Sequence, residues 1–98
     1  MDIILNKENN VLTIGLVGRL DTVTAPELDK TVTEQLADAT SVIFDLEKLT
    51  YTSSAGLRVF LKAQKLMNRK GEMKLIHVSE SVMEIFEITG FTDILTIE

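Results

Sequence analysis

The chain has 98 residues, 45% of them hydrophobic and 26% charged, which suits one folded domain and leaves no room for two. Its formal net charge of −5 argues against general nucleic-acid binding, and the absence of cysteine excludes disulfides and thiolate metal ligands. No apolar stretch could span a bilayer, and the first residues lack the basic region of a signal peptide. We therefore expect a cytoplasmic protein without membrane insertion or cofactor.

The N-terminal third predicts a β-hairpin and a helix. Two apolar runs, at 2–6 and 11–17, flank a polar turn, and the second run alternates apolar with small or polar residues. A helix is expected to begin at Thr24, which can form a capping box with Glu27. Pro26 is tolerated in that first turn because its missing N–H would be unpaired anyway.

The middle of the chain predicts a buried strand, a turn and a second helix. The run at 41–46 is almost continuously apolar, which indicates a strand covered on both faces. The serine pair Ser53-Ser54 follows, and apolar residues at helical spacing then continue towards Gly71, the expected end of the helix.

The C-terminal part predicts a strand at 73–78, a short helix and a last strand at 93–97. A second capping box, Ser81 with Glu84, opens the expected helix, and Gly90 ends it. The whole order is β-β-α-β-α-β-α-β. It predicts a single α/β domain over 1–98, with helices packed on a mostly parallel or mixed sheet.

The serine turn has the most informative position in the chain. Ser53 and Ser54 lie between a strand and a helix, where the free amides and dipole of the helix favour negative charge. A serine there can hold an anion or become one by phosphorylation. If Ala55 starts the helix, Ser54 lies close to the N-cap, and capping is compatible with phosphorylation.

The helix after this turn has two faces of interest. Arg58, Lys62, Lys65 and Arg69 recur at helical spacing and predict a solvated face. Leu57 and Leu61 fall on the flank that carries Ser54, away from the expected core stripe. Either they form an apolar partner contact beside the serine, or another element, such as the last helix, covers them.

Three blocks of the sequence resemble a known family. Residues 49–61 (LTYTSSAGLRVFL) look like the signature loop and helix of STAS domains, and 18–28 (GRLDTVTAPEL) and 87–95 (EITGFTDIL) are similar to two further blocks. The resemblance covers essentially the whole chain. It points most closely to the stand-alone bacterial anti-sigma factor antagonists, also called anti-anti-sigma factors.

The resemblance implies a phosphorylation-switched binding protein. In that family an anti-sigma factor that is itself a serine kinase phosphorylates a serine corresponding to Ser54; the unmodified antagonist sequesters this kinase and frees the sigma factor. Many members have aspartate where this chain has Ser53, which stays an alternative acceptor. Asp21 matches an acidic residue of the family and is otherwise a turn residue that helps to cap the next helix. The partner surface is then expected to comprise Asp21, Thr22, Ser53, Ser54, Leu57, Arg58 and Leu61, on a monomer or weak dimer.

Two other functions are compatible with parts of the sequence. A STAS scaffold in a stress-signalling or lipid-transport complex fits the same residues without any sigma factor. A serine hydrolase fits poorly, because Thr52 occupies the place of the first glycine in a Gly-x-Ser-x-Gly elbow. The single histidine, His77, is expected to be a packed or edge residue, and no metal site is expected because no histidine pair or cysteine exists. The sequence therefore predicts no enzyme.

Overall fold

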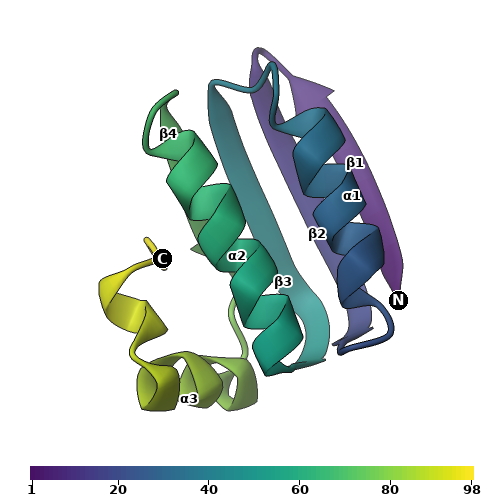
Figure 1. Cartoon of the computed structure of the whole chain (residues 1–98), viewed down its shortest axis with the longest axis vertical. Helices are drawn as coiled ribbons and strands as arrows, with labels where there is room; N and C mark the ends of the chain where they lie inside the picture. The colour runs from purple at the N-terminus through teal and green to yellow at the C-terminus, as the bar shows by residue number, and fades with distance from the viewer.

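The computed structural model describes residues 1–98 as four strands, three helices and a final 3-10 turn (Figure 1). In chain order these are β1 (Asp2–Glu8), β2 (Val11–Leu20), α1 (Ala25–Gln35), β3 (Ser41–Thr52), α2 (Ser54–Met67), β4 (Glu72–Ile76), α3 (Glu80–Thr89) and η1 (Phe91–Asp93). The prediction of a single α/β domain is confirmed. None of the helices has the length and apolar character that a membrane span requires.

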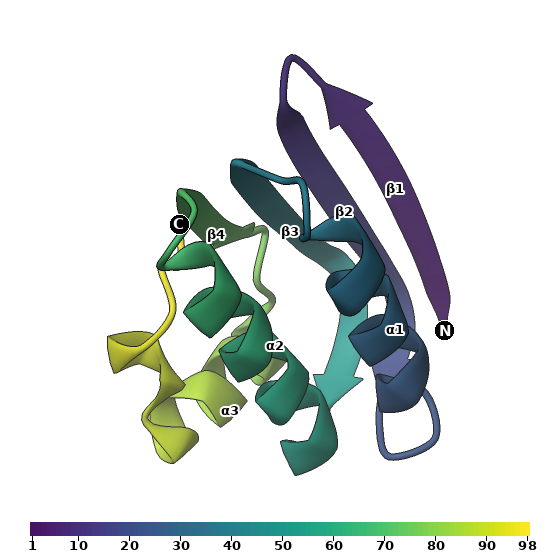
Figure 2. The ribbon, with the colours of Figure 1, turned by 45° about the horizontal axis from the view of Figure 1, so that its top comes forward.

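The strands lie in the sheet in chain order, β1-β2-β3-β4. β1 is antiparallel to β2, and β2, β3 and β4 are parallel neighbours. The two crossovers therefore step across the sheet in the same direction, and right-handed crossovers in one direction place their helices on one face. Figures 1 and 2 show α1 and α2 side by side on that face. The domain therefore has two layers, the sheet and the helices that cover one of its faces.

The prediction that the 41–46 strand is covered on both faces is wrong. Val42, Phe44 and Leu46 are buried beneath the helices, whereas Ile43 and Asp45 on the other face are partly exposed. The apolar run at 41–46 suggested a strand with both faces covered, but α1 and α2 both lie on the same face of the sheet. The opposite face of the sheet is consequently open in this chain.

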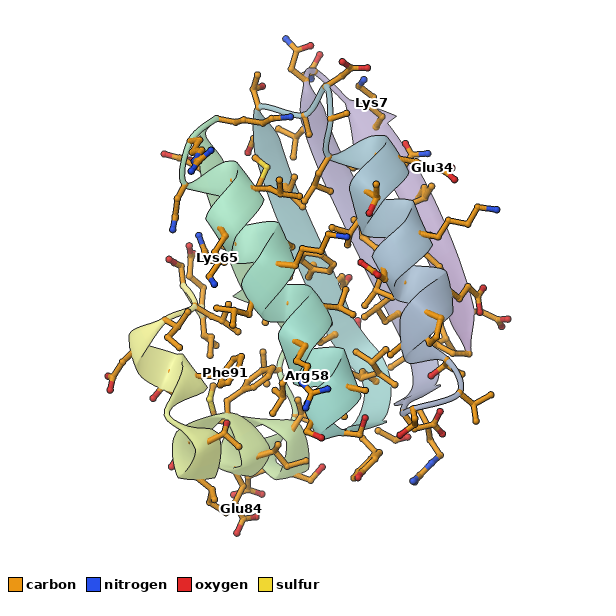
Figure 3. The ribbon with its side chains drawn as sticks, viewed as in Figure 1. Lys7, Glu34, Arg58, Lys65, Glu84 and Phe91 are labelled. Carbon is orange, nitrogen blue, oxygen red and sulfur yellow. The ribbon has the colours of Figure 1, made fainter.

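Three phenylalanine rings in edge-to-face contact tie the layers together. Phe44 of β3 meets Phe60 of α2 edge-to-face at 5.3 Å, and Phe60 meets Phe86 of α3 in the same way at 5.9 Å. All three are fully buried within a core of 23 hydrophobic residues. Phe91, on η1, packs against the edge of this core and lies on the side of the C-terminal segment that faces α2 (Figure 3). α3 is thus fixed against β3 and α2.

The predicted last strand at 93–97 is mostly wrong. The chain after Gly90 turns helically, with the Ile94 and Leu95 amides donating to the Phe91 carbonyl at 3.0 and 2.9 Å. This turn buries Leu95 in the core. Only Ile97 then joins the sheet, as an isolated parallel bridge to Leu75. Burial of Leu95 therefore overrides the strand propensity of the segment.

The ends of the helices differ from prediction in two places. Thr24 is the N-cap of α1 but its side chain makes no capping bond, and α3 is capped by Ser79, which accepts from the Val82 amide at 3.3 Å, rather than by Ser81. Gly90 ends α3 in the left-handed region, at φ +79°, as expected of a C-terminal glycine.

Strands β2 and β3 are longer than predicted, and this brings two loops together. Their register continues through two irregularities to the pair Leu20–Thr52, so both strands end at one rim. The first turn of α2 packs directly onto that rim. A Cβ on Gly56 would lie 2.5 Å from the Thr52 hydroxyl and 2.6 Å from Leu20 Cγ. Only glycine allows so close an approach.

We expect Gly56→Ala to lower the free energy of unfolding by about 1–3 kcal/mol, because the added methyl group must displace the fully buried Leu20. Urea denaturation measures this change. Gly15→Ala is the matched control: its Cβ would sit 3.7 Å from the nearest atom, an ordinary contact, and should change stability by less than about 0.5 kcal/mol. Equal stability of the two variants would contradict the close approach at Gly56.

Candidate functional site

The capping serine of α2 is Ser53. Its backbone is extended, at φ −95° and ψ 175°, and its hydroxyl accepts a long hydrogen bond of 3.4 Å from the Gly56 amide. Its own amide donates to the Leu20 carbonyl at 2.8 Å, which ties the turn to the end of β2. The helix begins one residue earlier than Ala55, so Ser54 is its first residue rather than its cap.

Ser54 therefore does not cap the helix. It is exposed, and its hydroxyl makes no hydrogen bond within the chain. As the first residue of α2 it lies among amides that have no partner inside the helix, at the positive end of the helix dipole. The arrangement can accept a negative group at Ser54 without breaking an existing hydrogen bond.

Asp21 organises the neighbouring loop after β2. One of its carboxylate oxygens accepts from the amides of Val23 and Thr24 at 3.0 and 3.1 Å. The Thr24 hydroxyl accepts from the Asp21 amide at 2.9 Å and donates to the Arg19 carbonyl at 2.8 Å. The Thr24 side chain is thus occupied in closing this loop, which explains why it does not cap α1. The expected role of Asp21 as a turn residue is confirmed, but its carboxylate accepts from amides that precede α1 and does not cap the helix.

These contacts favour the charged form of Asp21. The hydrogen bond from the Thr24 amide contributes most to holding the pKa of Asp21 below its usual value of 3.8. The Val23 amide, the Thr24 hydroxyl and the charge of Arg19 act in the same direction, against partial burial. The rim therefore carries a fixed negative charge at neutral pH.

The same rim has exposed groups that the sequence did not single out. Val23, beside Asp21, is 85% exposed. The guanidinium of Arg19 lies 4.3 Å from the centre of the Tyr51 ring, a cation–π contact between the ends of β2 and β3. The exposure of Val23 could have been predicted, because it is an apolar residue within the polar turn at 21–24. The Arg19–Tyr51 contact could not, because it depends on the register between β2 and β3.

Leu57 does not belong to an exposed flank. It is only 4% exposed and is part of the same core cluster as Phe86 of α3. The prediction that Leu57 offers an apolar partner contact is therefore wrong, and the alternative, cover by another element, holds for it. Leu61, one turn later, is partly exposed. Leu57 was misplaced because its burial depends on tertiary packing, which the helical pattern alone does not show.

The cationic residues of α2 lie on its solvent side, as predicted. Arg58, Lys62, Lys65 and Arg69 are all exposed, and Figure 3 shows Arg58 near the start of α2 and Lys65 nearer its end. Lys62 forms an ion pair with Asp29 of α1 at 2.6 Å. Next to that pair a groove of about 330 Å³ between the two helices is lined in part by Thr22 and Arg58. Thr22 and Arg58 thus share one accessible surface.

Neither serine has a catalytic base. The single histidine, His77, lies just beyond β4 and is hydrogen-bonded to Asp45 at 3.0 Å, not to the serine turn. A serine nucleophile needs a base within hydrogen-bonding reach. The geometry is that of an accessible hydroxyl without a histidine base.

Comparison with known proteins decides the family. A family model described as "STAS domain" matches residues 2–98. The chain belongs to the STAS domain family. A curated relative, the anti-sigma-B factor antagonist of Staphylococcus aureus (strain NCTC 8325 / PS 47), is 36% identical over 80 residues, which are 80% of this chain and 74% of that protein.

Solved structures agree with this STAS fold. An anti-sigma factor antagonist from Mycobacterium paratuberculosis matches with a TM-score of 0.90 at 18% identity, over 98% of this chain and 83% of that one. The Bacillus cell fate determinant SpoIIAA in its phosphorylated form matches with a TM-score of 0.77 at 18% identity, over 99% and 91% of the two chains. At this identity the likeness concerns the fold.

We expect the charge of Asp21 to stabilise the protein in a pH-dependent way. Because its pKa is lowered in the folded state, the stabilisation is present above about pH 3.8 and is lost as the pH falls through the folded-state value. Asp21→Asn should therefore unfold at lower urea concentration than the wild type at neutral pH, and the difference should shrink in acid.

The control for this measurement is Asp38→Asn, which removes an exposed carboxylate that makes no hydrogen bond within the chain. It should leave the urea midpoint near the wild-type value across the same pH range. A difference between wild type and Asp21→Asn that stays constant down to the most acidic pH would contradict the assigned role.

Proposed function

We propose that this chain is an anti-sigma factor antagonist switched by phosphorylation of Ser54. In its unmodified form it binds and sequesters an anti-sigma factor that has serine kinase activity, and the sigma factor is released. Phosphorylation of Ser54 by that kinase separates the two proteins. The chain acts as a binding surface and a kinase substrate, and not as an enzyme.

The observation that carries the proposal is that the two serines have different roles in the structure. Ser53 caps α2, and this leaves the Ser54 hydroxyl exposed and unbonded. A kinase needs an accessible hydroxyl, and only Ser54 offers one without loss of a helix cap. The relatives named as anti-sigma factor antagonists, and the solved phosphorylated form of SpoIIAA, support a phosphorylation-switched antagonist, and the choice of Ser54 rests on its exposed hydroxyl.

The phosphate is expected to weaken partner binding without destabilising the fold. A phosphoserine adds about −1.5 to −2 charges at neutral pH. The N-terminus of α2 tolerates that charge, because its free amides and dipole favour anions. A partner surface that fits a neutral hydroxyl beside the charged Asp21 would meet additional negative charge and a larger group. Binding should weaken while the folded state persists.

The proposed partner surface comprises the accessible residues of the two rim loops and the first turns of α2. It retains Asp21, Thr22, Ser53, Ser54, Arg58 and Leu61 from the predicted set, and Val23 joins them because of its exposure. Leu57 leaves the set because it is buried. The surface is mixed in polarity, which suits a reversible complex.

We expect Ser54→Asp to bind such a partner at least about 10-fold more weakly than the wild type, and Ser54→Ala to bind about as well as the wild type. The measurement is calorimetric titration with each kinase-like anti-sigma factor encoded in the same genome. Equal binding by Ser54→Asp and Ser54→Ala to a partner that binds the wild type would contradict the switch.

Intact mass after incubation with the same kinases and ATP tests the modification itself. The wild type should gain one phosphate and Ser54→Ala none. Ser53→Ala is the matched control and should still gain one, although its helix loses the cap. Loss of the phosphate in Ser53→Ala alone would move the acceptor to Ser53 and overturn the assignment to Ser54.

A further inference from the structure

A second polar cluster lies on the open face of the sheet, away from the serine turn. Asp45 and Glu47 project from β3, and His77 follows the last residue of β4. The parallel register pairs Asp45 with Ile76, which brings His77 beside the two carboxylates although it is 32 residues further along the chain. Phe44 and Leu46 alternate with them towards the core, so the cluster faces away from α1 and α2.

An irregularity in β3 lies between the two carboxylates and helps to position that of Asp45. The β2–β3 register slips between Gly15–Asp45 and Val17–Lys48, so β3 has one residue more than β2 in this stretch. The Glu47 amide donates to the Asp45 carboxylate at 3.1 Å, within the extra loop of backbone. His77 has a left-handed backbone, at φ +56°, which turns the chain at the end of β4.

The three side chains converge to the dimensions of a metal site. The imidazole Nδ1 of His77 lies 3.0 Å from Asp45 Oδ1 and 3.9 Å from Glu47 Oε2. All three ligand atoms lie within 4.8 Å of one another. Bond lengths of about 2.0–2.2 Å to a tetrahedral zinc ion place its ligand atoms about 3.4 Å apart. The observed separations bracket that value.

The charge of the cluster is not balanced by the protein. Neither carboxylate has a lysine or arginine within 4.0 Å, and His77 is the only basic group that either contacts. One imidazole N–H can serve only one of the two carboxylates well. A divalent cation would satisfy both carboxylates and the imidazole nitrogen together. The nitrogen donor distinguishes this triad from a group of surface carboxylates and favours zinc-type ions over calcium or magnesium.

We propose that Asp45, Glu47 and His77 bind one divalent ion of the zinc class. Three protein ligands leave at least one coordination position open, for water or for a group from another molecule. The side chains are 32%, 68% and 57% exposed respectively, so an ion can reach them from solvent. An adjoining groove of about 300 Å³ on the open face is lined in part by Asp45 and Glu47 and leaves room for the fourth ligand.

The ion would join β3 to the end of β4. The sequence predicts no metal site, because it contains no histidine pair and no cysteine. The sheet register brings the two carboxylates beside His77, and this prediction is replaced by the proposed site. The site lies on the opposite face of the sheet from the helices, and it does not depend on phosphorylation of Ser54. Binding to the folded state alone would raise the thermal midpoint as zinc concentration rises.

The single histidine makes the test direct. In the ¹H NMR spectrum of the metal-free protein, the imidazole signals report His77 alone. Titration with ZnCl₂ should shift or broaden these signals and saturate at one equivalent, and calorimetry should give the same stoichiometry. Asp45→Asn, Glu47→Gln and His77→Gln should each weaken zinc binding by about 10-fold or more.

Glu84→Gln is the matched control. It removes an exposed carboxylate on α3, labelled in Figure 3, and should bind zinc as the wild type does. Ser54→Ala should also bind zinc normally, which separates this proposal from the phosphorylation switch. Circular dichroism confirms that each variant is folded.

Three results would overturn the proposal. The first is the absence of any change in the His77 signals under a large excess of zinc. The second is normal binding by both Asp45→Asn and Glu47→Gln, which would mean attachment to the imidazole alone. The third is equal weakening in Glu84→Gln, which would mean non-specific binding to acidic residues.

Discussion

The contact between Gly56 and the rim of the sheet is the constraint on which the site depends. The first turn of α2 approaches Leu20 and Thr52 so closely that no side chain fits between them. This contact fixes where the first turn of α2 lies relative to the ends of β2 and β3. It therefore also fixes the position of Ser53 and Ser54 relative to the loop that carries Asp21. Because Leu20 ends β2 and Thr52 ends β3, one packing contact aligns two loops that lie more than thirty residues apart in the chain.

The sequence predicted those features that local chemistry determines. The alternation of Leu12, Ile14 and Leu16 specified a strand with one buried face, and Gly90 specified the end of a helix. The serine turn was placed correctly between β3 and α2. Its capping residue was misassigned by one position, because two adjacent serines can each cap a helix and only the packing of its first turn decides between them.

The errors share a different cause, which is tertiary contact. Leu57 is buried in the core by tertiary packing, and nothing within its own helix indicates this. The open face of β3 follows from the order of strands in the sheet, since an apolar run such as 42–44 fits either one or two covered faces. Likewise His77 meets Asp45 and Glu47 through strand register. Local patterns cannot specify such long-range pairings.

The capping role of Ser53 also has a kinetic consequence. Its hydroxyl accepts from the Gly56 amide and its own amide is bonded to Leu20, so an enzyme can engage the Ser53 hydroxyl only after this capping hydrogen bond has opened. Ser54 is presented on the closed structure. The rate of modification at Ser53 would thus be limited by the population of a locally unfolded state, and that at Ser54 by encounter. The fold thereby makes modification of Ser53 depend on the free energy of local unfolding, whereas modification of the chemically identical Ser54 does not.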